Sequence, residues 1–338
     1  MQKIVLGCVV LIVLVGGGRI GYYADAREVV VFTALDQIFS EPILQDFEKA
    51  TGITVKAVYD IEATKTTGLV NRLIAEKKNP QCDVFWNNEV IKSIILKRKG
   101  IITPYVSPAS VDIPIHFKDK DGYWTGFAAR ARVLVINTEL VDNNQQPDSI
   151  FNLTDSRWKG KIAIANPLFG TTSTHVAALF SYLGKDKARQ YFENLKKNQI
   201  RIVDGNSVVK DQVGAGELKA GFTDTDDVNM GLKFGMPLRP LYPDKRGMGT
   251  LLIPNTVSLI ANCPNPNEGK ELIDYLLSKE VEKKLAFSPS VQMPLRPDVP
   301  TPENFVNIAQ IKAMEVNYEK VADEMDGAVI FVQNLFIR

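Results

Sequence analysis

The chain is poor in the side chains that most often carry catalysis and metal binding. Its 338 residues include two His and three Cys. No two Cys have the C-x-x-C spacing of zinc sites or redox pairs, and neither G-x-S-x-G nor H-E-x-x-H occurs. Forty Lys and Arg against 39 Asp and Glu leave a net charge of +1. This balance argues against nucleic acid or a membrane surface as a partner.

An apolar run near the N-terminus, Ile4–Val15, is too short to span a bilayer comfortably and is typical of an export signal. Ala24-Asp25-Ala26 supplies a small-x-small cleavage pattern, so residues 1–26 are predicted to be a signal segment. Lipidation at Cys8 is an open alternative. A G-x-G-x-x-G pattern at 16–21 is not followed by a helix, so we expect no nucleotide and no other cofactor.

The chain after residue 26 is long enough for two domains and begins with a βαβ pattern. A β-branched strand at Val29–Phe32 leads through a polar loop to an amphipathic helix at Pro42–Ala50. A second β-branched strand follows at Ile53–Tyr59. Further apolar strands are predicted at 83–86, 123–138, 161–166, 220–223 and 258–261, with helices between most of them. The sequence therefore predicts an α/β protein built on mostly parallel sheets.

Polar loops follow several of these strands. In open α/β folds the ligand lies outside the carboxyl ends of the strands, so these loops are predicted to meet around a ligand. They are Asp36–Ser40, Glu62–Gly68, Asn87–Glu89, Pro167–His175 and Asp224–Asn229.

Two of the loops open helices with hydroxyl groups, which favours an anion. Free N–H groups at a helix start, together with hydroxyl donors, suit a phosphate, phosphonate or carboxylate. Ordinary helix capping is the alternative, although one hydroxyl is enough for a cap. The candidates are Thr64, Thr66 and Thr67 in one loop, and Gly170, Thr171, Thr172 and Ser173 in the other.

Charged groups provide a second set of candidates. Arg130 and Arg132 lie two apart on a predicted strand, so they share a face and need anionic partners if buried. The partner is either a ligand or a core Asp or Glu. Asp224, Asp226 and Asp227 cluster at a strand end, where a cation or an amine would offset their repulsion. A turn that caps the next helix is the alternative.

Several segments resemble the periplasmic solute-binding proteins of ABC importers, especially the ferric-iron-binding branch. The resemblance is carried by Thr33–Glu41, Phe47-Glu48-Lys49-Ala50-Thr51-Gly52-Ile53-Thr54-Val55, Asp83-Val84-Phe85-Trp86-Asn87-Asn88-Glu89, Arg130-Ala131-Arg132-Val133-Leu134-Val135 and Met293-Pro294-Leu295. It implies a type II two-lobed binding-protein fold, with crossover strands near 125–137 and 249–258. Residues 27–125 and 255–338 would form lobe 1, and residues 126–254 would form lobe 2.

The resemblance also implies a role and a location. The chain would be a monomeric, periplasmic binding protein that delivers its ligand to the transmembrane subunits of an ABC permease, and not an enzyme. A carboxylate-dependent hydrolase is the weak alternative. Cys82 and Cys263, the two Cys after the signal, are either a disulfide or two buried thiols.

The sequence departs from the iron-binding relatives at the ligand positions. Those relatives use a histidine or similar group in the first loop, a glutamate after the D-V-F-[YW] strand, and a tyrosine pair in the second lobe. Here Gln37, Asn88 and the Asp226–Asp227 pair stand at these positions. We therefore expect a small anionic or zwitterionic solute, such as a phosphonate or carboxylate with an amine, bound with Asp36, Gln37 and Asn88. Ferric iron or another metal, held by Asp226 and Asp227, is the alternative.

Overall fold

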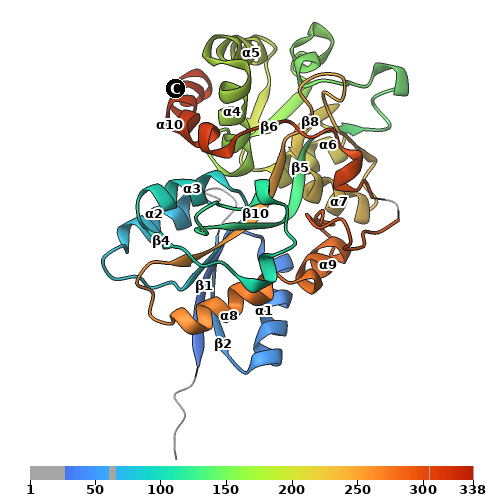
Figure 1. Cartoon of the computed structure of the whole chain (residues 1–338). Coiled ribbons are helices and arrows are strands. Elements are labelled where there is room, and N and C mark those ends of the chain that lie inside the picture. The colour runs from blue at the N-terminus through green and yellow to red at the C-terminus, as the bar shows by residue number, and fades with distance from the viewer. Residues whose placement is uncertain (1–26, 61–65, 304, 338) are drawn as a thin grey trace, which may run out of the picture.

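A computed structural model describes residues 27–60, 66–303 and 305–337. It has two α/β lobes with two long strands running between them (Figure 1). This is the predicted type II binding-protein fold. The predicted signal segment lies outside the described residues.

The first lobe, in the lower part of Figure 1, is built mainly from the N-terminal third of the chain. Its elements in chain order are β1 (Glu28–Thr33), α1 (Gln37–Thr51), β2 (Thr54–Tyr59), α2 (Thr67–Ala75), β3 (Val84–Asn87), α3 (Ile91–Arg98) and β4 (Ile102–Thr103). Helices α8 (Pro266–Leu276) and α9 (Lys279–Phe287) return to it.

The second lobe, in the upper part of Figure 1, is built mainly from the middle of the chain, and the C-terminal helix α10 (Tyr318–Phe336) packs on it. It contains β6 (Ile162–Ala165), α4 (Gly170–Leu183), α5 (Lys185–Lys197), β7 (Arg201–Val203), α6 (Asn206–Gly214), β8 (Ala220–Asp224), α7 (Thr225–Lys233) and β9 (Leu238–Leu241). Short 3-10 turns lie at Pro108–Ser110, Ile115–Phe117, Asn143–Gln145, Ile150–Thr154, Ser156–Trp158 and Ile308–Gln310.

Strands β5 (Thr125–Asn137) and β10 (Leu252–Ile260) join the lobes into one ten-stranded sheet. The strand order is β2-β1-β3-β10-β5-β8-β6-β7, with β4 also on β10 and β9 also on β5. β1 is parallel to β2 and β3, and β6 is parallel to β7 and β8, whereas the two crossover strands pair antiparallel. Since β5 and β10 run through both lobes, the lobe limits near residues 126 and 254 stay a prediction.

The core explains why β5 has an unbroken apolar run at residues 133–136. All 13 of its residues are buried. Leu134 and Ile136 pack with α3, α4 and α10 (Tyr318–Phe336) on one face of the sheet, while Val133 and Val135 pack with α6 and α7 on the other. A strand that is covered on both faces reads as a continuous hydrophobic run.

Two predicted helix starts were too late in the sequence. The first helix begins at Gln37 and contains Pro42, which has no N–H to donate within the helix. The helix predicted from about Ser173 begins at Gly170, so its hydroxyl groups lie inside the first turn. This difference changes which of them can face a ligand.

The two cysteines that the structure describes, Cys82 and Cys263, are buried free thiols. Burial raises the pKa of the Cys263 thiol to about 11. Among the described residues, no helix is long and apolar enough to cross a membrane.

A buried ion-pair network braces β5 from the side of α9. Glu282 is fully buried and accepts a hydrogen bond from the backbone N–H of Ala128 at 3.0 Å. Arg296 donates to Glu282 at 2.8 Å and to Asp112 at 2.5 Å. Lys279 also contacts Asp112, at 2.9 Å.

Asp112→Asn is expected to lose stability in a pH-dependent way. Although burial raises the pKa of Asp112, hydrogen bonds from Arg296 and Lys279 lower it to about 2, from 3.8. A lowered pKa in the folded state contributes stability above pH 3.8 that disappears as the pH falls towards about 2. The difference in unfolding free energy between wild type and variant should therefore shrink over this range. Denaturant titrations at several pH values measure it.

The control is Asp323→Asn, which removes an exposed ion pair with Arg98 and should change stability by no more than about 0.5 kcal/mol. A difference for Asp112→Asn that stays constant from neutral pH to about pH 2 would contradict the assignment.

Candidate functional site

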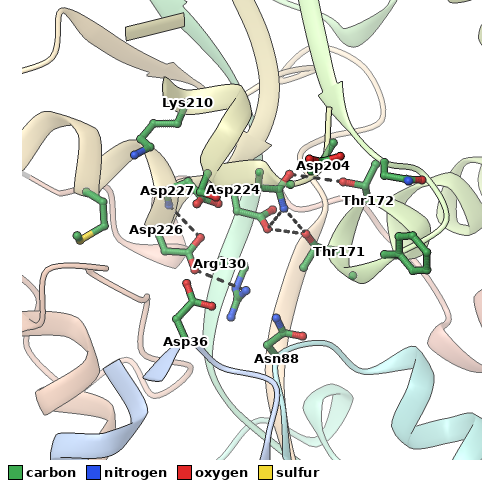
Figure 2. A pocket seen from close by; sticks show the side chains of 18 of the residues that line it. Asp36, Asn88, Arg130, Thr171, Thr172, Asp204, Lys210, Asp224, Asp226 and Asp227 are labelled. Carbon is green, nitrogen blue, oxygen red and sulfur yellow. Dashed lines mark hydrogen bonds and ion pairs between the residues drawn. The ribbon is translucent and has the colours of Figure 1, made fainter. Parts of the chain in front are cut away.

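A cavity of about 200 Å³ lies between the lobes, where the polar loops converge. Asp36, Ile38, Phe39 and Asn88 enter it from lobe 1, and Arg130 enters it from β5 (Figure 2). Residues of lobe 2 form the remainder: Ala165, Asn166, Phe169, Gly170, Thr171, Thr172, Asp204, Gly205, Asn206, Ser207, Lys210, Asp224, Asp226, Asp227 and Met230. Its size suits a small solute.

Three helices of lobe 2 begin at this cavity. Helix α4 starts at Gly170, α6 at Asn206 and α7 at Thr225, and their first residues line the cavity or adjoin it. The first N–H groups of a helix have no partner within the helix, and they carry the positive end of its dipole. The starts of α4 and α6 therefore make this wall of the cavity attractive to an anion, whereas the start of α7 carries its own carboxylates, Asp226 and Asp227.

Arg132 holds these loops together from behind the cavity. Its side chain is fully buried and pairs with Asp224 at 2.8 Å. The same guanidinium donates to Thr171 at 3.2 Å, Asn206 at 3.1 Å and Thr172 at 3.3 Å. Thr171 donates in turn to the second oxygen of Asp224 at 2.5 Å. One ion pair thus fixes the starts of α4 and α6 to β5 and β8. The partner of Arg132 is therefore a core aspartate and not a ligand, which is one of the two alternatives left by the sequence.

Arg130, in contrast, lines the cavity and has a looser ion pair. One terminal nitrogen donates to Asn255 at 3.2 Å, and the other lies 3.5 Å from Asp226. The side chain is only 4% exposed, and its Nε has no hydrogen-bond partner among the described residues. Burial alone would lower the pKa of Arg130, but the carboxylates around it, Asp226 foremost, raise it above the ordinary value. The group is therefore a fixed cation with unused donors.

The carboxylates of the cavity gather beside Arg130. Figure 2 shows Asp36, Asp226 and Asp227 on one side of it, with Thr171 and Thr172 on the other side. Asp224, Asp226 and Asp227 each offer an oxygen within 4.8 Å of the others. Two of these three already contact an arginine, Arg132 or Arg130. The cavity therefore has one half with the starts of α4 and α6 and hydroxyls, which also holds Asp204 and the Arg132-paired Asp224, and one half with Asp36, Asp226 and Asp227 beside Arg130.

The structure brings together most of the residues that the sequence singled out. Those that line the cavity are Asp36, Asn88, Arg130, Gly170, Thr171, Thr172, Asp224, Asp226 and Asp227. Thr64 lies outside the described residues.

Gln37, Thr66, Thr67, Arg132 and Ser173 are not among the lining residues. Gln37 is exposed on α1 and donates to Glu41, also on α1. Thr66 is buried behind the cavity and donates to Asn88 at 2.7 Å, and Thr67 heads α2 beside it. Ser173 donates to the carbonyl of Gly170, because the earlier start of α4 turns its hydroxyl back onto the helix.

Sequence reasoning missed the segment from Asp204 to Lys210. The signal was present: the short β-branched strand Arg201–Val203 is followed by Asp204-Gly205-Asn206-Ser207, the same strand-then-polar-loop pattern as elsewhere. A strand of three residues is too short to show a period. Lys210 adds a buried ammonium group to this wall, paired with Asp211 at 2.5 Å.

Glu89, the acidic neighbour of Asn88, does not line the cavity. It is buried, and its carboxylate accepts hydrogen bonds from the N–H groups of Ile91 at 2.6 Å and Lys92 at 2.8 Å, capping α3. It also accepts from Thr174 of α4 at 2.9 Å, which links the two lobes. Burial raises the pKa of Glu89.

The fold and the interlobe cavity define a solute-binding protein of the two-lobed periplasmic type. The chain belongs to the bacterial extracellular solute-binding protein family, whose sequence profile matches residues 80–313.

Named relatives differ in what they bind. The chain is 24% identical over 309 residues to the major ferric iron-binding protein of Neisseria meningitidis, covering 88% of this chain and 89% of that protein. It is 25% identical over 295 residues to the putative 2-aminoethylphosphonate-binding periplasmic protein of Salmonella typhimurium, covering 84% and 83%.

Solved structures confirm the fold. Iron-bound HitA from Pseudomonas aeruginosa matches with a TM-score of 0.83 at 20% identity, covering 92% of this chain and 99% of that one. AfuA from Actinobacillus pleuropneumoniae, with fructose-6-phosphate bound, matches with a TM-score of 0.80 at 22% identity, covering 91% and 98%.

The two arginines are expected to differ in what they stabilise. Arg132→Met leaves Asp224 buried without its cation, which should cost about 3–5 kcal/mol of unfolding free energy in the ligand-free protein. Arg130→Met should cost less, because its 3.5 Å pair with Asp226 is looser than the 2.8 Å pair of Arg132 with Asp224. Urea denaturation of both variants measures the difference. Equal losses would contradict the division into a structural and a ligand-facing arginine.

Proposed function

We propose that this protein is the binding component of an ABC importer and captures a small zwitterion, with a phosphonate or carboxylate group and an amine. The observation that carries the proposal is the division of one cavity into two halves of opposite chemistry. The anionic group would lie at the starts of α4 and α6 with Arg130, and the ammonium group would lie against Asp36, Asp226 and Asp227. Each half satisfies one end of such a ligand.

Ferric iron is the second candidate, supported by the three clustered carboxylates and by the iron-binding relatives. Two observations favour the zwitterion. Among the described residues that line the cavity none is a tyrosine, so no phenolate is available there to neutralise Fe³⁺. In addition, Arg130 and Arg132 already contact Asp226 and Asp224 and would repel a trivalent ion bound there.

The wider role follows from the family. We infer that the protein is exported, acts outside the cytoplasmic membrane as a monomer, and hands its ligand to the transmembrane subunits of a permease. The two lobes would close on the ligand by hinge motion in β5 and β10, with helix α10 moving with α4 of the second lobe.

Asp226→Asn is expected to weaken binding of 2-aminoethylphosphonate at least tenfold, about 1.4 kcal/mol, because it removes a charge that pairs with the amine and keeps the shape. Isothermal titration calorimetry of the purified protein measures the affinity. Asp186→Asn, in the first turn of α5 and away from the cavity, is the matched control and should bind like wild type.

Ferric citrate, titrated separately, tests the second candidate. Iron would become the favoured ligand under three results together: wild type retains iron, Asp226→Asn does not, and the phosphonate gives no heat of binding. A visible charge-transfer band with iron would require a phenolate ligand and would contradict the site described above.

A further inference from the structure

Crossover strand β5 carries an extra residue at the point where it pairs with β10. Ala129 lies opposite Pro254 and Phe127 lies opposite Asn255, so Ala128 has no partner in the ladder. Its φ of 40° is in the left-handed region, which is unfavourable for a residue with a Cβ. An extra residue of this kind is a β-bulge, which bends its strand locally. The bend lies on a strand that both lobes share.

Two fully buried side chains hold the backbone of Ala128. Its N–H donates to Glu282 at 3.0 Å, and its carbonyl accepts from Nδ2 of Asn255 at 2.8 Å. Arg296 fixes Glu282 from behind at 2.8 Å. The bulge is therefore clamped on one side by α9 and on the other side by Asn255, from the second crossover strand.

The same amide of Asn255 holds the cavity arginine. Oδ1 of Asn255 accepts from Arg130 at 3.2 Å, while Nδ2 donates to Ala128 and, at 2.7 Å, to Gln292. This orientation is forced, because a guanidinium only donates and a backbone carbonyl only accepts. One planar group thus touches both the ligand-facing cation and the bend between the lobes.

Arg130 has donors left for a ligand. Its Nε is buried with no partner among the described residues, and its other terminal nitrogen lies 3.5 Å from Asp226. A buried donor without an acceptor is unfavourable, so an anion that reaches the guanidinium gains this contact. The planar fork of arginine can pair with the anion and keep its hydrogen bond to Asn255.

We propose that Asn255 is a positioning residue that couples ligand contact at Arg130 to the bend of β5 at Ala128, so that ligand binding and lobe closure are linked. The proposal rests on the proposed function in one respect, that an anionic group reaches Arg130. Because coupling is reciprocal, a variant at Asn255 that loosens the bend should also lower the affinity for the ligand, although Asn255 does not line the cavity.

The first test is a double-mutant cycle on the affinity for 2-aminoethylphosphonate. Asn255→Ala should weaken binding about tenfold, the size of one lost hydrogen bond to a charged group. In the Arg130→Lys background, where the fork that joins ligand and Asn255 is gone, the same change should cost no more than about threefold. Equal costs in both backgrounds, or wild-type affinity of Asn255→Ala, would overturn the proposal.

The second test needs no ligand. Hydrogen exchange of the amides in 125–131 should be faster in Asn255→Ala than in wild type by about tenfold, and also faster in Arg130→Lys. The matched control is Asn137→Ala, a buried Asn on the same strand whose amide donates to Val213 at 2.8 Å, away from the cavity. It should leave exchange in 125–131 unchanged. Unchanged exchange in Asn255→Ala, or the same increase in Asn137→Ala, would overturn the coupling.

The two tests also separate the coupling from the ligand class. If wild type does not bind the phosphonate, the proposed ligand is wrong. Hydrogen exchange then tests by itself whether Asn255 couples Arg130 to the bend at Ala128. Should Asn255→Ala not fold, Asn255→Ser replaces it with the same expected outcomes, because a serine hydroxyl is too short to span Arg130 and Ala128 together.

Discussion

The buried pair of Arg132 and Asp224 is the interaction on which the cavity depends. Removing a guanidinium and a carboxylate from water is costly, and the cost is offset here because both carboxylate oxygens of Asp224 and both terminal nitrogens of Arg132 are hydrogen-bonded, while Nε of Arg132 has no partner among the described residues. The partners come from β5, β8, α4 and α6, so a single cluster sets the distances between the loops that face the ligand. Thr171 and Asn206 bind within it and also line the cavity.

In this arrangement two arginines that cannot be distinguished in the sequence have different roles, one structural and one facing the ligand. Both lie on one face of β5, two residues apart. Arg132 is behind the cavity wall, and its charge is used up by Asp224. Arg130 is at the cavity, and its nearest carboxylate is 3.5 Å away.

The balance of charge in the cavity also bears on the ligand. Several carboxylates stand near Arg130 and Lys210, and three helices point their N-terminal ends toward the same space. A purely cationic ligand would leave the helix starts unused, and a purely anionic one would meet the carboxylates. Solved structures with iron bound and with fructose-6-phosphate bound share this fold, so the lining side chains and not the fold select the ligand.

Strand and helix patterning in the sequence determined the α/β class, because apolar strands covered on both faces must read as hydrophobic runs, and it predicted which polar loops follow them. It also predicted most of the cavity, since parallel strands end at one edge. The sequence did not determine which side chains face inward. Ser173 turned back onto α4, Glu89 turned away to cap α3, and Asp204–Lys210 entered the cavity after a strand too short to detect. Only tertiary structure decided these, because they depend on helix phase, on the bend at Ala128 and on contacts between residues far apart in the chain.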